Sequence, residues 1–192
     1  MRHENTAALE FLLTRRSRPA KTLKPPVPER DEIRRLLRAA ARAPDHGKLE
    51  PWRFLVLERA ALQRLASLVM RLGAARGIDA DALEKPRRQF ADADLVVAVV
   101  SAPLASDKVP GREQILSAGA VCLQLLNAAL ASGWGANWLS GWMASDREFL
   151  SEGLGLAAHE FVAGFIHVGT ETIVPPERPR PDVDAKTSWV DR

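Results

Sequence analysis

Apolar residues recur at helical spacing in several stretches of the chain. Over residues 29–42, Ile33, Leu36 and Ala40 share one helical face. Acidic residues stand in the first turn of this stretch and arginines follow towards its end, as the helix dipole favours. This pattern predicts helices over residues 6–16, 29–42, 60–76, 79–92 (cut at Pro86) and 112–132, with a short helix from 141 to 150.

Other stretches carry the β-branched and aromatic residues of buried strands, over residues 52–58, 94–102, 136–140 and 161–169. The segment 94–102 is an uninterrupted apolar run of strand length. A strand without a polar side is covered on both faces, so we expect it in the middle of the sheet.

The segment 112–132 is apolar almost all round, and a helix without a wide polar side is buried by a large core or by a second subunit. The chain from Val174 onward is rich in proline and charge, so we expect it to lie extended on a surface, which a partner subunit would supply.

The segment from Arg42 to Phe54 connects a predicted helix to a predicted strand. Pro44 and Pro51 bracket it, and each proline favours an extended conformation for the residue before it, such as Glu50. The polar run Asp45-His46-Gly47-Lys48 lies between them, where binding residues often stand on a rigid scaffold. An ordinary polar turn is the alternative.

The composition suits one domain over residues 1–192, with 46% hydrophobic residues and a formal net charge of +3. The basic residues are spread along the chain, which argues against nucleic-acid binding. The single cysteine, Cys122, lies in an apolar run and is interpreted as a core residue. There is neither a signal-peptide pattern nor an uninterrupted apolar run of spanning length, so we expect no membrane association and a cytoplasmic location.

The sequence offers little catalytic machinery of its own. The four histidines (His3, His46, His159 and His167) have no metal-ligand spacing, the chain has no phosphate-binding glycine loop, and Ser140 lacks the glycines of a nucleophile elbow. Tyrosine is absent. Such a protein either catalyses nothing or uses an organic cofactor, and we favour the cofactor.

Several motifs in order resemble the nitroreductase family of flavoproteins. They are Arg15-Arg16-Ser17, residues 37–54 with Ala-Pro-Asp-His and Pro-Trp, Ala118-Gly119-Ala120, Trp138-Leu139-Ser140-Gly141 and residues 164–169. The resemblance implies an α+β fold with a central, mainly antiparallel sheet wrapped by helices. It also implies an intertwined homodimer with one FMN at each end of the interface.

Carried over by position, the resemblance implies that FMN is contacted by three groups of residues: Arg15, Arg16 and Ser17; Arg42 and His46, supplied by the opposite subunit; and Trp138, Leu139 and Ser140. The arginines of the first group would face either the phosphate or the electron-rich pyrimidine side of the flavin. Relatives carry arginine where this chain has Leu139. Our hypothesis is that Arg178 or Arg180 replaces that arginine.

The resemblance further implies an oxidoreductase that takes hydride from NAD(P)H and reduces electron-poor acceptors such as nitroaromatics or quinones by a ping-pong mechanism, with no catalytic acid or base of its own. Two alternatives remain at this point: a protein that stores or senses FMN, or does other flavin chemistry without NAD(P)H turnover, and a basic module that binds nucleic acid without a cofactor.

Overall fold

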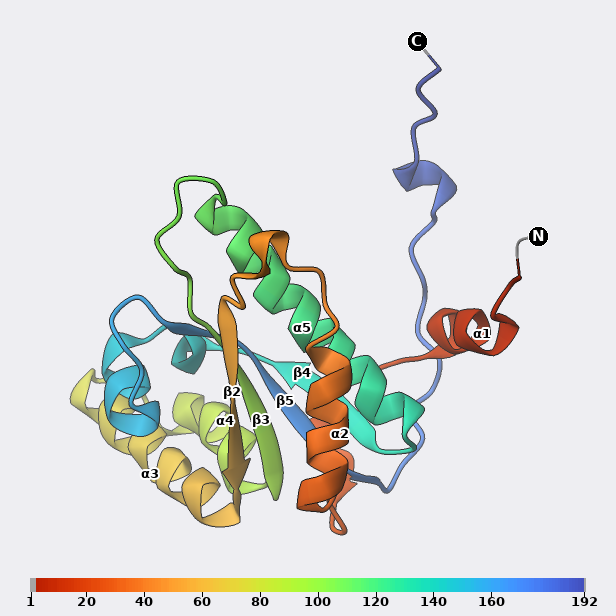
Figure 1. Cartoon of the computed structure of the whole chain (residues 1–192). Coiled ribbons are helices and arrows are strands. Elements are labelled where there is room, and N and C mark those ends of the chain that lie inside the picture. The colour runs from red at the N-terminus through yellow and green to blue at the C-terminus, as the bar shows by residue number, and fades with distance from the viewer. Residues whose placement is uncertain (1–2, 192) are drawn as a thin grey trace.

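A β-sheet lies between two layers of helices in the computed structural model, which describes residues 3–191 (Figure 1). The helices are α1 (Thr6–Thr14), α2 (Arg30–Ala40), α3 (Arg59–Ala75), α4 (Ala80–Ala91) and α5 (Gly111–Ala131). The strands are β1 (Leu23–Lys24), β2 (Trp52–Glu58), β3 (Leu95–Ser101), β4 (Gly135–Leu139) and β5 (Phe161–Glu171). Short turns η1 (Ala20–Thr22), η2 (His46–Lys48), η3 (Trp142–Ala144), η4 (Phe149–Gly153) and η5 (Asp184–Lys186) complete the described elements.

Every strand pairing within residues 3–191 is antiparallel. The order β1-β5-β3-β2 forms the main path, and β4 pairs with β5 over Gly135–Leu139. β3 lies between β2 and β5, and all seven of its residues are buried. The predictions of a mainly antiparallel sheet and of a central strand at 94–102 are therefore confirmed.

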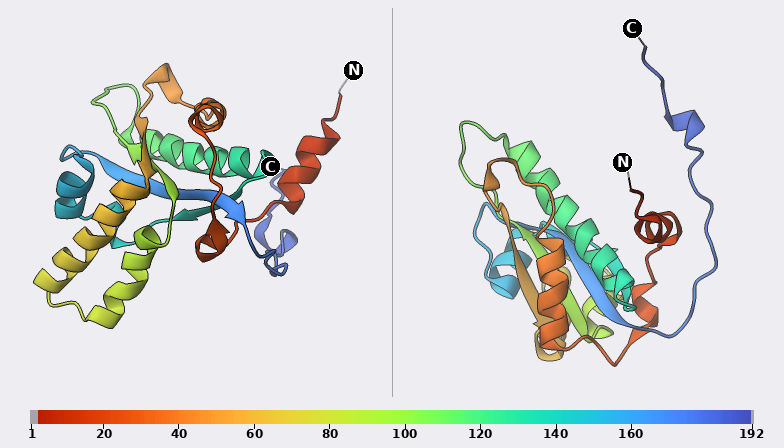
Figure 2. Two further views of the ribbon diagram at one scale, coloured as in Figure 1. Left: turned by 90° about the horizontal axis from the view of Figure 1, so that it is seen from below. Right: turned by 45° about the vertical axis from the view of Figure 1, so that its right-hand side comes forward.

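Alternate residues of the central strands face two separate cores. Val96, Ala98 and Val100 pack towards α3 and α4, whereas Val97 and Val99 pack towards α2 and α5. Figure 2 shows the sheet edge-on between the two helical layers. The period-2 alternation of strand side chains thus explains why an all-apolar strand is needed at this position.

The structure corrects two details of the helix prediction. Pro86 does not cut α4, because Leu83 and Phe90, two turns apart on the same helical face, are both buried and anchor the helix on either side of the proline. The short helix expected over 141–150 is instead two pieces, η3 and a second piece that contains η4, interrupted at Ser145 and Asp146.

The loop before β2 also differs from expectation. Glu50 precedes a proline but has φ 48°, in the left-handed region, and so is not extended. Its N–H donates to the Asp45 carboxylate at 2.7 Å, and its carbonyl accepts from Trp52 N–H at 2.7 Å. These two hydrogen bonds hold a conformation that the Pro51 ring disfavours.

Several apolar surfaces have no cover within the described residues. On α5, Ile115, Leu116 and Leu123 are exposed, and Leu12 and Leu13 of α1 are exposed as well. From Thr172 to Asp191 the chain runs away from the body beside α1 and is extended except at η5 (Figure 1). The extended course was predicted, whereas the partner surface expected beneath it stays a prediction. α5 also has the length and hydropathy of a membrane span, but its other face packs on the sheet as a core helix does.

Candidate functional site

Four arginines and a serine from distant parts of the chain line one cavity. Arg15, Arg16 and Ser17 follow the end of α1, and Arg178 and Arg180 come from the tail; together they surround a space of about 110 Å³. The predicted triplet and the two tail arginines therefore lie together. A guanidinium cluster of this kind is typical of sites for phosphate or carboxylate groups.

The arginines of this cavity are short of partners. Arg15 Nε and both Nε and Nη1 of Arg16 are buried without a hydrogen-bond partner in the described chain. Arg180 pairs with Glu177 at 2.8 Å, and Arg15 is within 3.5 Å of the Ser17 hydroxyl. Burial, and then the charge of Arg180, lowers the pKa of Arg15. The cavity thus holds an excess of positive charge that an anion would neutralise.

The segment after this triplet runs along β4. Arg18 N–H donates to the Ala136 carbonyl at 2.8 Å, and the Asn137 side chain donates to the Arg18 carbonyl. Arg18 also pairs with Glu171 on β5 at 3.1 Å. These contacts tie the arginine cavity to the edge of the sheet.

A larger pocket opens at the far end of β4. It has a volume of about 660 Å³ and is lined by Leu139, Ser140 and Gly141, by Ala20 and Lys21, by the polar side of α4 and by His167 of β5. This volume lies in the usual range for small-molecule sites. Trp134, just before β4, borders Arg15 and Arg16. Since β-strand residues advance by about 3.3 Å each, Ser140 at the other end of β4 lies roughly 17 Å along the strand from Gly135.

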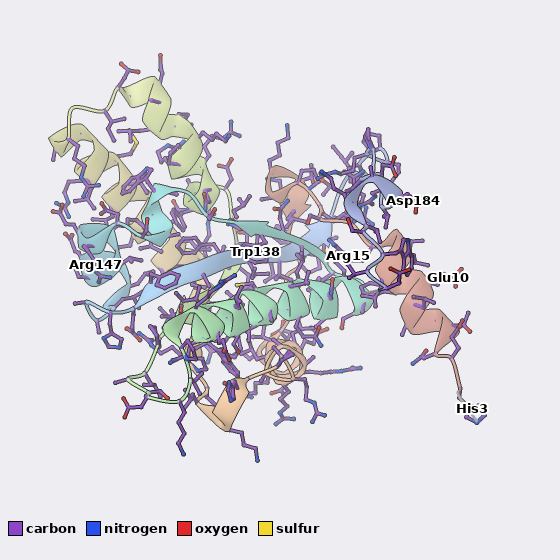
Figure 3. All side chains as sticks on the ribbon, turned by 90° about the horizontal axis from the view of Figure 1, so that it is seen from above. His3, Glu10, Arg15, Trp138, Arg147 and Asp184 are labelled. Carbon is purple, nitrogen blue, oxygen red and sulfur yellow. The ribbon has the colours of Figure 1, made fainter. Side chains whose placement is uncertain are left out.

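The three residues predicted at this end of β4 do not share one face. Leu139 lies opposite Phe165 and so faces the α4 side, whereas Trp138 lies opposite Ile166 and faces the α5 side. The Trp138 indole covers Gly164 and donates to the Ala163 carbonyl at 3.3 Å. Figure 3 shows Trp138 near α5 and Arg15 close to the end of that helix. A ligand in the large pocket would meet Leu139 and Ser140 and not the Trp138 ring.

The tail arginines do not stand beside Leu139. Arg178 and Arg180 line the small cavity, while Leu139 lines the large pocket. If the tail arginines compensate for the arginine missing at position 139, they do so by binding an anion in the small cavity and not by occupying the place of that side chain.

Arg42 and His46 lie apart from the other predicted site residues. His46 Nδ1 is 2.7 Å from Glu113 Oε2 near the start of α5, and Ser117 donates to the Pro44 carbonyl at 2.7 Å. Arg15 lies near Leu130, close to the other end of α5. At a rise of 1.5 Å per residue, Glu113 and Leu130 are roughly 25 Å apart. One chain therefore does not bring His46 to the arginine cavity.

Sequence reasoning missed Lys21, Gln89 and His167 as lining residues. Their pocket forms where α4, β4 and β5 meet, and no local motif marks them. A buried polar residue inside an apolar strand, as at His167, is the one available signal, because such a residue needs a partner.

Comparison with known proteins identifies the family. The profile described as "Nitroreductase family" matches residues 12–170. The chain belongs to the nitroreductase family. It is similar to "Putative NAD(P)H nitroreductase YdjA" of Escherichia coli K12, with 35% identity over 163 residues, covering 85% of this chain and 87% of the relative. A Haemophilus influenzae protein described as "Putative NAD(P)H nitroreductase" is 36% identical over 166 residues, covering 85% and 88%.

Solved structures confirm the fold. A nitroreductase-like family protein from Bacillus cereus superposes with a TM-score of 0.78 at 22% identity and covers all of both chains. A nitroreductase with bound FMN from Bacteroides fragilis NCTC 9343 gives a TM-score of 0.72 at 19% identity, with 95% and 98% coverage. The expected α+β nitroreductase-like fold is therefore observed.

Proposed function

We propose that this protein is an FMN-dependent oxidoreductase that takes hydride from NAD(P)H and reduces electron-poor acceptors such as nitroaromatics and quinones, with ping-pong kinetics. Family membership and the names of the two relatives support this proposal. The observation that carries it is the cavity of four arginines with buried, unpartnered nitrogens, together with a pocket at the other end of β4 that is large enough for an aromatic ring.

The residues present fit FMN. Arg15, Arg16 and Ser17, with Arg178 and Arg180, would hold the phosphate, because the unpartnered guanidinium nitrogens lack the acceptors that a phosphate provides. Leu139 and Ser140 would border the ring in the large pocket. When bound, FMN would supply the redox chemistry that no side chain of this protein provides.

The residues of the chain would then bind and orient FMN. The arginines would fix one end of the cofactor by charge, and the hydrogen bonds of Arg18 to Ala136 and Asn137 would hold the segment after the triplet against β4. No group of three or more His, Cys, Asp or Glu side chains in residues 3–191 is arranged to hold a metal. Because bound FMN would supply the redox chemistry, the proposal requires no catalytic acid or base from the chain.

We further propose a homodimer in which the uncovered faces of α5 and α1 and the tail are buried. In a two-fold symmetric dimer the same patch meets itself. If the two α5 helices cross antiparallel over Leu116 and Leu123, the start of the partner's α5 lies at the end of this α5. Arg42 and His46 of one subunit would then reach the arginine cavity of the other. A single domain over residues 1–192 and a cytoplasmic location remain predictions of the sequence.

Initial-rate kinetics test the activity. Without oxygen, protein reconstituted with FMN should oxidise NADPH or NADH over many turnovers only when a nitroaromatic or quinone is present, and double-reciprocal plots at several acceptor concentrations should be parallel. FMN bound without NAD(P)H oxidation would instead support storage, sensing or other flavin chemistry.

A comparison of FMN with riboflavin tests the phosphate assignment. Removing a charged hydrogen bond should weaken FMN binding by about 1.5–3 kcal/mol, and riboflavin, which lacks the phosphate, should bind unchanged. We expect this for Arg16→Ala and for Arg178→Ala and Arg180→Ala. Arg34→Ala, which removes an exposed arginine paired with Asp31 on α2, is the matched control. Unchanged FMN affinity in both tail variants would refute a role for the tail arginines.

A further inference from the structure

The imidazole of His46 is held by a carboxylate from a distant part of the chain. Its Nδ1 is 2.7 Å from Oε2 of Glu113, which stands in the first turn of α5. An ionised carboxylate accepts hydrogen bonds and donates none, so Nδ1 carries a proton and donates it to Glu113. Within residues 3–191, Nε2 of His46 has no hydrogen-bond partner. This nitrogen is therefore the atom of the ring that is free to meet a ligand.

The backbone that carries His46 is fixed by its surroundings. Lys48 and Glu50 have φ of 55° and 48°, and residues other than glycine keep such a conformation only where neighbouring contacts hold it. One of these contacts comes from α5, where the Ser117 hydroxyl donates to the Pro44 carbonyl at 2.7 Å. The loop thus fixes the backbone of His46, and rotation of the imidazole is left to be fixed by a side-chain contact.

The contact between His46 and Glu113 contributes little to the stability of the fold. The two side chains are 60% and 48% exposed, and water screens the attraction between groups as exposed as these. The main effect of the contact is on orientation. It selects one rotamer of the imidazole and directs Nε2 away from the carboxylate.

The pair stands beside the uncovered apolar face of α5. Leu116 follows Glu113 by three residues, lies on the same side of the helix and is 62% exposed. A second copy of this chain that covers Leu116, as in the dimer proposed above, would also meet the His46 ring. With the two α5 helices antiparallel, the arginine cavity of that copy would come within reach of Nε2.

We propose that Glu113 is a positioning residue, whose carboxylate holds Nδ1 of His46 so that Nε2 points to the cofactor bound at the arginine cavity of the second subunit. The inference rests on the proposed function and on the proposed dimer, because it assigns a residue of one subunit to the site of the other. Glu113 acts only through His46 of its own chain and does not touch the cofactor.

A double-variant cycle tests this role, with FMN binding measured by quenching of flavin fluorescence. Glu113→Ala should raise the Kd about tenfold, which is at the lower end of the loss when the orienting partner of a ligand-binding histidine is removed. In a His46→Ala background the same change should alter the Kd by less than about twofold, because no imidazole remains to be oriented. Glu113→Gln keeps an oxygen that accepts from Nδ1 and should recover most of the affinity. Glu152→Ala, which removes an equally exposed carboxylate paired with Arg71, is the matched control and should leave the Kd unchanged.

Mixed dimers, made by refolding two variants together, show on which chain Glu113 acts. Glu113→Ala paired with Arg16→Ala should keep one intact site, because two-fold symmetry places both changes in the other site. Glu113→Ala paired with His46→Ala should keep none, because each site then receives one altered His46 or Glu113. FMN binding by this second mixed dimer should not exceed the average of the two variants.

Thermal unfolding without flavin separates positioning from a structural role, and Glu113→Ala should leave the Tm within about two degrees of wild type. Equal increases in Kd with and without His46 would overturn the inference, as would a Glu113→Gln variant that binds FMN as weakly as Glu113→Ala. A Kd that His46→Ala leaves unchanged would overturn it too, while leaving FMN binding by the arginines intact. Wild-type protein that binds no FMN would refute the proposed function itself, which is a different result.

Discussion

Arg16 and His46 provide a test of whether two chains build one site. The two residues lie near opposite ends of α5, roughly 25 Å apart by helix rise, so a single cofactor cannot contact both in one chain. If FMN contacts both, they come from different subunits. Arg16→Ala and His46→Ala should each weaken FMN binding by about 1.5–3 kcal/mol, which raises the Kd for FMN roughly 10- to 150-fold.

Mixing the two variants should then restore activity. Random pairing of equal amounts makes about half of the dimers mixed, and two-fold symmetry gives each mixed dimer one intact site and one doubly altered site. The mixture should therefore regain about one quarter of the wild-type sites, and a mixed dimer purified with two affinity tags about one half.

The assay is FMN-dependent NADPH oxidation with a quinone acceptor, at an FMN concentration that saturates wild-type protein but neither variant. The mixed dimers are made by unfolding the two variants and refolding them together, and each variant unfolded and refolded alone is the control. A purified mixed dimer no more active than the average of the two variants would refute the shared site, because it would mean that no combination of chains brings an intact Arg16 and His46 to the same cofactor.

Three further predictions concern the sheet around the site. Burial lowers the pKa of His167 to about 4, so between about pH 6.5 and 4 the unfolded chain binds more protons than the folded one, and the free energy of unfolding should fall by about 3 kcal/mol as the pH drops through this window. Urea titrations should show that His167→Leu removes this pH dependence. Glu160 is held by Arg53 at 2.7 Å, and this hydrogen bond lowers its pKa to about 2, so its contribution to stability should be lost only as the pH falls from 4.5 towards 2; an unchanged acid limb in Glu160→Gln would contradict this. Gly164→Ala places a Cβ 2.2 Å from the Trp138 indole nitrogen and should lower the Tm by several degrees. The same change in a Trp138→Ala background should be tolerated, and equal losses of Tm in both backgrounds would contradict the clash.

Local patterns in the sequence predicted most of the elements. The apolar run at 94–102 indicated a central strand, and β3 occupies that place because both of its faces are covered. The third helix, predicted over residues 60–76, ends at Ala75, and Gly77 with φ 70° takes the left-handed position after the Arg76 cap.

The errors arose where contacts in the folded chain outweigh the conformational preference of a single residue. Pro86 would break an isolated helix, but Leu83 and Phe90 bury enough apolar surface to keep α4 continuous. Glu50 takes a left-handed conformation because a hydrogen bond from its N–H to Asp45 supports it. Neither contact can be read from spacing.

The candidate site was predictable only in part. The Arg15-Arg16-Ser17 triplet followed from the family resemblance, and the structure joins it to Arg178 and Arg180, whose proximity depends on the path of the tail. The pocket at Gln89 and His167 was not foreseen, because it requires α4 to lie beside the end of β4. Sites made by distant segments need the fold before they can be recognised.

The visible absorption spectrum of the purified protein tests the flavin oxidoreductase assignment most directly. We predict that protein supplied with FMN shows bound-flavin absorption that bleaches on anaerobic addition of NADPH or NADH and returns when a nitroaromatic or quinone is added. Absence of bound flavin even with added FMN would contradict the assignment of the cofactor, and flavin absorption that persists with both nicotinamides would contradict the assignment of the reductase activity.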